Sequence, residues 1–62
     1  MIFFVNKITN EFLSGFGLTE DFERKMCFES VAVGMSALET FCECNNGYYV
    51  EDFLMYVKAE VY

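Results

Sequence analysis

The strongest pattern of apolar and polar positions lies in the middle of the chain. When residues are placed at 100° per position, as on an α-helix, the apolar ones fall within an arc of roughly 140°. Glutamates and small polar residues occupy the opposite side. This segregation predicts an amphipathic helix with one face toward a core. The core-facing positions are Cys27, Phe28, Val31, Gly34, Met35, Leu38, Phe41 and Cys42.

Both ends of this helix carry recognisable signals. Thr19 precedes three acids in residues 20–23, the pattern of an N-cap hydroxyl followed by acids in the first turn. The Asn-Asn-Gly run at 45–47 tolerates the positive φ that closes many helices. We therefore expect the central helix at about 20–44. Gly34 is its weak point, costing up to about 1 kcal/mol against alanine unless another element packs closely there.

The N-terminal segment fits two patterns equally. Met1, Phe4, Val5, Ile8 and Phe12 follow the i, i+3, i+4, i+7 spacing of a helix. The same stretch, rich in Phe, Ile and Val, also has the composition of a short strand.

The C-terminal segment is equally divided. The spacing of a helix is followed by Val50, Phe53, Leu54, Val57 and Val61. The alternation of a strand is followed by Phe53, Met55, Val57, Ala59 and Val61. We expect a single all-α domain over residues 1–62, with three helices around the long central one. The alternative is an α+β arrangement in which terminal strands at 1–8 and 48–62 flank the central helix.

Size and composition predict self-association. The chain has 62 residues, of which 55% are hydrophobic and 19% aromatic. A three-helix body of this size cannot enclose that much apolar surface. Residues outside the helical apolar arcs are then expected to cover a self-contact or a partner site, giving a homodimer or a higher oligomer. These residues are Phe3, Tyr48, Tyr49, Met55 and Tyr56.

The residues that most chemistry requires are scarce. Histidine, the commonest general acid and base, is absent. Gly15-Phe16-Gly17 lacks the rest of a phosphate-binding fingerprint and indicates a turn. Cys42 and Cys44 point about 200° apart on a helix, and Cys27 lies roughly 22 Å away along it, so the thiols do not predict a metal site. We expect no enzymatic activity, no metal and no cofactor.

The expected compartment is the cytoplasm of a cell or host cell. An odd number of cysteines argues against a secreted disulfide framework, and Asn6 and Lys7 end the initial apolar run too early for a signal peptide. The longest uncharged stretch, 30–38, is far shorter than the roughly 20 residues of a membrane span. With four basic residues in all, direct binding to nucleic acid is not expected either.

Charge is unevenly distributed along the chain. The net charge is −6, and residues 26–57 hold five acids and no base. An acidic surface of this kind has two interpretations. It keeps a protein rich in apolar residues soluble, or it docks a basic protein partner, because complementary charge speeds encounter and fixes orientation. Exposed tyrosines are frequent interface anchors. The predicted partner-binding residues are Glu29, Glu39, Glu43, Tyr48, Tyr49, Glu51, Asp52 and Tyr56.

Two functions follow from these observations. In composition, this short acidic chain rich in Phe, Tyr and Met resembles the small modulators that bacteriophages make against host enzymes. The resemblance implies a protein-binding module that inhibits or modulates a partner, such as a host enzyme of nucleic-acid handling or defence. The alternative is a homo-oligomeric structural or assembly protein that inhibits no partner.

Overall fold

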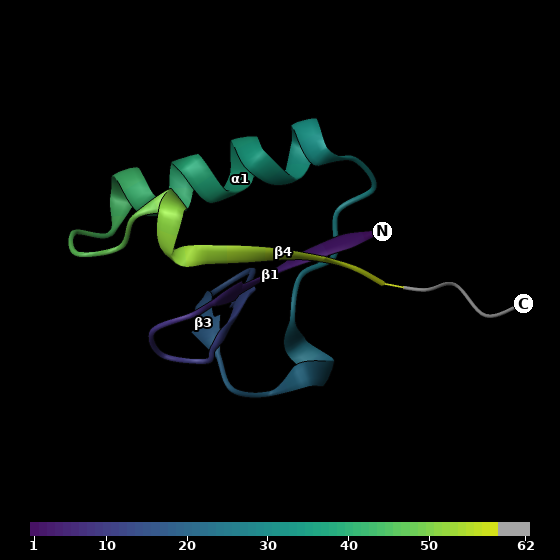
Figure 1. The fold of residues 1–62 in the computed structure, drawn as a ribbon, viewed down its shortest axis with the longest axis horizontal. Coiled ribbons are helices and arrows are strands. Elements are labelled where there is room, and N and C mark those ends of the chain that lie inside the picture. The colour runs from purple at the N-terminus through teal and green to yellow at the C-terminus, as the bar shows by residue number, and fades with distance from the viewer. Residues whose placement is uncertain (59–62) are drawn as a thin grey trace, which may run out of the picture.

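The computed structural model describes residues 1–58, in which one α-helix packs on one face of a four-stranded antiparallel sheet (Figure 1). The strand order is β3-β2-β1-β4. The elements along the chain are β1 (Ile2–Asn6), β2 (Phe12–Ser14), β3 (Gly17–Thr19), the 3₁₀ turn η1 (Phe22–Arg24), α1 (Val31–Cys44), the 3₁₀ turn η2 (Val50–Asp52) and β4 (Phe53–Val57).

The predicted all-α, three-helix arrangement is therefore wrong, and the fold is α+β. The alternative with a central helix and terminal strands is closer. Its strands were predicted over 1–8 and 48–62, whereas β1 and β4 are five residues each. The last part of the second prediction, 59–62, lies outside the described residues.

The central position of β1 explains why its sequence does not alternate. Antiparallel pairing with β4 sets Ile2 opposite Val57 and Asn6 opposite Phe53, while β2 pairs on the other side. Ile2 and Phe4 lie under α1, and Phe3 points to the opposite face, where other aromatic rings cover it. A strand covered on both faces has a nearly continuous apolar sequence. Over only five residues, such a sequence also matches the apolar spacing of a helix.

The helix begins at Val31 and not near residue 20. Ile2 and Phe28 exchange backbone hydrogen bonds of 2.8 Å, so the chain before α1 runs beside β1 and cannot be helical there. Ser30 is the true N-cap, its hydroxyl accepting from the Val33 N–H at 3.3 Å. The predicted end at Cys44 is confirmed, with Gly47 at φ 94° just beyond it.

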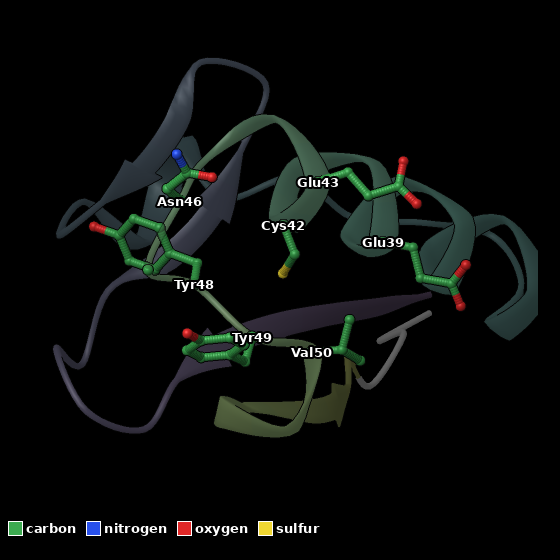
Figure 2. Close-up of a pocket in the computed structure, with 8 residues that line it drawn as sticks. Glu39, Cys42, Glu43, Asn46, Tyr48, Tyr49 and Val50 are labelled. Carbon is green, nitrogen blue, oxygen red and sulfur yellow. The ribbon is translucent and has the colours of Figure 1, made fainter.

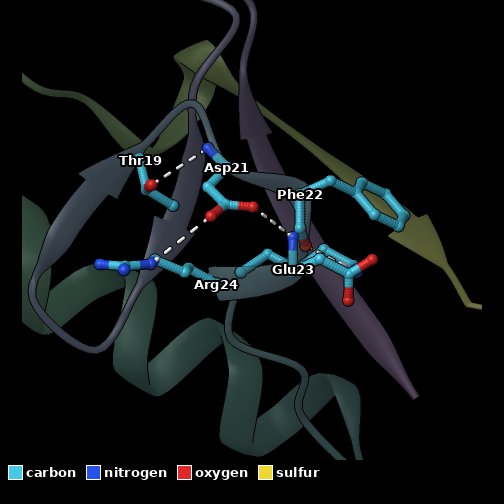
Figure 3. A network of polar contacts seen from close by, with 6 residues as sticks. Thr19, Asp21, Phe22, Glu23 and Arg24 are labelled. Carbon is cyan, nitrogen blue, oxygen red and sulfur yellow. Dashed lines mark hydrogen bonds and ion pairs between the residues drawn. The ribbon is translucent and has the colours of Figure 1, made fainter.

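The capping signal at Thr19 serves a smaller element. Its hydroxyl accepts from the Asp21 N–H at 3.1 Å, and the Asp21 carboxylate accepts from the Glu23 N–H at 2.9 Å (Figure 3). Arg24 forms an ion pair with Asp21 at 3.5 Å. These contacts close η1 as a single turn, after which Lys25 returns to extended backbone.

The core lies between α1 and the sheet. It consists of Ile2, Phe4, Leu13, Phe28, Leu38 and Phe53. Loops are fixed by local hydrogen bonds, and Asn6, which is buried, accepts two loop N–H groups through its side-chain oxygen. Among the described residues, no helix has the length and apolar character needed to cross a bilayer.

Candidate functional site

A shallow groove lies at the C-terminal end of α1 and contains four of the predicted partner-binding residues. Glu39 and Glu43, one turn apart on the helix, line it together with Tyr48 and Tyr49 of the following loop, and their carboxylates point away from the two tyrosine rings (Figure 2). The groove has a volume of about 610 Å³. We call it the α1 groove, and its other lining residues are Cys42, Asn46, Gly47 and Val50.

The remaining predicted site residues lie elsewhere. Glu29 precedes the helix, so it does not share a helical face with Glu39 as the periodicity suggested. Glu51 and Asp52 belong to η2, directly after the groove. Tyr56 lies on the sheet face away from α1, stacked on Phe3 with ring centroids 5.6 Å apart. The structure thus divides the predicted surface into separate parts.

The α1 groove offers carboxylates and tyrosine rings, with little nucleophilic chemistry. Burial, and secondarily the negative charge of Asp52, raise the pKa of the Cys42 thiol. A raised pKa keeps the thiol protonated at neutral pH, and the thiolate is the reactive form. Tyr48 is half-buried, its ring centroid 5.5 Å from that of Phe41, whereas Tyr49 is exposed. The arrangement is suited to binding a protein surface.

A second surface is the sheet face opposite α1, where the short turn η1 places Phe22 and no α-helix lies within residues 1–58. Aromatic rings gather on it, and Phe3 contacts Phe12, Phe22 and Tyr56 with centroid separations of 5.6 to 6.1 Å. A hollow of about 400 Å³ lies among them. We call this surface the open sheet face, and its other hollow-lining residues are Val5 and Asn10.

Lys25 closes one side of the open sheet face. Its ammonium lies 3.4 Å from the centre of the Phe22 ring and 5.3 Å from that of Phe3. It also donates to the Phe22 carbonyl at 3.0 Å. This cation–π contact holds Phe22 over the sheet and explains why Phe3 is buried. The prediction that Phe3 lies on an outer contact surface is therefore wrong, because its side chain is buried.

Strand β4 forms one edge of the sheet, and of its exposed residues only Met55 and Tyr56 were expected on a contact surface. Four consecutive apolar residues are exposed on it, with 45% of Leu54, 46% of Met55, 45% of Tyr56 and 74% of Val57 accessible. Leu54 and Val57 had been placed in a helical apolar arc. The alternation of residues 53, 55 and 57, on which the strand alternative rested, was the signal that identified this segment correctly.

The three cysteines do not form a cluster. Cys27, Cys42 and Cys44 are free thiols. Among residues 1–58, no group of three or more Cys, Asp or Glu side chains is placed to hold a metal ion.

None of the protein-family models, curated proteins or solved structures compared with the chain matches it. The arguments about function therefore rest on the geometry of the α1 groove, the open sheet face and strand β4.

Proposed function

We propose that the protein is a homo-oligomeric assembly protein, in which the exposed strand β4 and the adjoining open sheet face bind a second copy. The observation that supports this most directly is the run of exposed apolar side chains at Leu54, Met55, Tyr56 and Val57. Leu54 and Tyr56 are accessible on the open sheet face, and Met55 and Val57 on the other face of the same edge strand. Exposed apolar surface of this kind on small proteins commonly marks interaction sites. The setting we propose is intracellular, consistent with the free thiols.

Light scattering or sedimentation of the purified protein tests this function. We expect a mass of at least twice 7.2 kDa at tens of micromolar protein. A strictly monomeric mass over that range would contradict the proposal.

A matched pair of variants locates the contact. Leu54→Lys introduces a charge into the proposed surface, whereas Ile8→Lys makes the same charge change at an exposed residue of the β1–β2 loop. We expect Leu54→Lys to shift the protein to monomer and Ile8→Lys to leave its mass unchanged. Equal effects would mean that net charge controls assembly and β4 does not.

A second candidate function is favoured by the α1 groove, where Glu39, Glu43, Tyr48 and Tyr49 gather. In this proposal the groove docks a basic protein and modulates it, in the manner of a phage-type inhibitor of a host nucleic-acid-handling or defence enzyme. Complementary charge would act mainly on the association rate.

The test is an affinity pull-down at low and high salt, read by mass spectrometry. We expect a partner that is lost at high salt, and lost also when Glu39 and Glu43 are both replaced by lysine. The matched control replaces Glu20, just before η1, and Glu23, within η1, with lysine; both acids are exposed and the net charge changes equally. Binding that survives the groove variant, or fails equally with the control, would contradict a groove-specific contact.

A further inference from the structure

The outer edge of β4 carries backbone groups that no other described strand meets. Lys58 N–H donates to Met1 O, and Lys7 N–H donates to Asp52 O, both at 2.8 Å. In an antiparallel ladder, hydrogen-bonded and non-bonded positions alternate. Residues 54 and 56 therefore bond to β1, and the N–H and C=O of Met55 and Val57 face outward. Phe53 also faces outward, although its N–H is taken by the Val50 carbonyl.

Strand β4 lacks the features that normally protect an edge. Exposed edges are usually short, charged, bulged or interrupted by proline, because unpaired backbone groups recruit further strands. The sequence Phe53–Val57 contains none of these, while the opposite edge, β3, is only three residues long. Among residues 1–58, β4 is thus the longer and less protected edge.

We propose that β4 pairs with β4 of a second copy in an antiparallel register whose twofold axis passes through Met55. The two sheets then form one continuous sheet of eight strands, four from each copy. This inference rests on the proposed homo-oligomeric function and specifies its contact. Met55 faces its own counterpart, and Leu54 faces Tyr56 of the other copy. Aliphatic and aromatic pairs of this kind stabilise neighbouring strands.

Charge selects this register over its neighbours. Asp52 of η2 directly precedes β4 and Lys58 directly follows it, so with the axis at Met55 the acidic end of each strand meets the basic end of the other. An axis at Leu54 or at Tyr56 would shift these charged ends two residues out of step with each other. The strand between these two charges is uncharged, so two chains of net charge −6 meet there without direct repulsion.

Disulfide trapping tests the register. In a background with alanine at Cys27 and Cys42 and serine at Cys44, Met55→Cys is compared with Val57→Cys. A hydrogen-bonded pair separates the Cα atoms by about 5.5 Å, which a disulfide can span. In the proposed register the two Val57 Cα atoms are offset by roughly 13 Å along the strands. We expect mild oxidation to join Met55→Cys chains and to leave Val57→Cys chains at least tenfold less crosslinked.

The outcomes separate this inference from the function on which it rests. If Val57→Cys crosslinks as readily as Met55→Cys, or neither does while light scattering still shows a dimer, the register is wrong and self-association stands. If the unmodified chain is monomeric, both proposals are overturned.

A charge exchange gives a readout that requires no cysteine. Asp52→Lys and Lys58→Asp should each raise the dissociation constant of the dimer about three- to tenfold, because each creates two like-charge pairs. The double variant restores both opposite-charge pairs, and we expect it to regain most of the affinity. Additive losses in the double variant would overturn the pairing of Asp52 with Lys58.

Discussion

Gly34 of α1 lies directly against Ile2 of β1. A Cβ atom built on Gly34 would stand 2.8 Å from the Ile2 Cδ1 atom and 3.1 Å from the Phe4 ring. Both neighbours are buried, so neither can move far without disturbing the core. The glycine that weakens the helix locally is the residue that lets α1 approach the sheet.

We expect Gly34→Ala to destabilise the protein by about 1 to 3 kcal/mol, because crowding in a packed core outweighs the gain in helix propensity. Ala32→Gly, at an exposed position of the same helix, should lower the free energy of unfolding by about 1 kcal/mol. This variant measures the difference in helix propensity between alanine and glycine without a change in core packing. Urea unfolding of both variants checks this, and a stabilised Gly34→Ala protein would contradict the close approach.

Leu38→Ala should cost about 2 to 5 kcal/mol, since Leu38 is 1% exposed and belongs to the core. Glu39, the next residue, is exposed. Its replacement by alanine should change the unfolding free energy by less than about 0.5 kcal/mol. Denaturant melts that reverse this order would mean that the other face of α1 meets the sheet.

Asn6→Ala should destabilise the fold by about 1 to 3 kcal/mol. The Asn6 side-chain oxygen accepts from the N–H groups of Ile8 and Thr9 at 2.9 and 3.0 Å, and removing it leaves these donors without their partner. Thr9→Ala is the control, because the Thr9 hydroxyl makes one exposed contact of 3.4 Å. Thermal unfolding should separate the two variants clearly, and equal melting temperatures would contradict the role of Asn6.

Cys42 should react more slowly than Cys44 with iodoacetamide near neutral pH. Burial and the charge of Asp52 raise the pKa of Cys42, which lowers its thiolate fraction at any given pH, whereas Cys44 is exposed. Peptide mapping after timed alkylation measures both rates. Asp52→Asn should increase the Cys42 rate without removing the difference, because burial is the larger cause of the raised pKa. A faster Cys42 would contradict the described environment.

The sequence predicted the second half of α1 well and its beginning poorly. The helix end at Cys44 followed from the local Asn-Asn-Gly signal. The start was placed too early because Phe28 fits the helical arc, while its actual position is set by pairing with Ile2, more than twenty residues away. Thr19 showed a capping pattern, and nothing local distinguishes the cap of a single turn from the cap of a long helix.

Candidate site residues could be predicted only where a local pattern decided their position. Glu39 and Glu43 share a helix face, so their proximity was predictable, and Tyr48 and Tyr49 follow in the next loop. Tyr56 was grouped with them by exposure, yet strand pairing with Phe3 places it on the opposite side of the sheet. The choice between helix and strand for β1 and β4 depends on their pairing with each other, which neither segment encodes alone.

The pairing of β1 with β4 also determines when the fold can form. Ile2 finds Val57 only by closing a loop that contains almost every described residue, and this closure costs chain entropy before the new contacts can compensate it. Until then, β1 has no strand on its β4 side, and Phe3 lacks the Tyr56 ring that stacks on it. We therefore expect the β4-facing edge of β1 to stay open to chaperones and to other chains until β4 has left the ribosome.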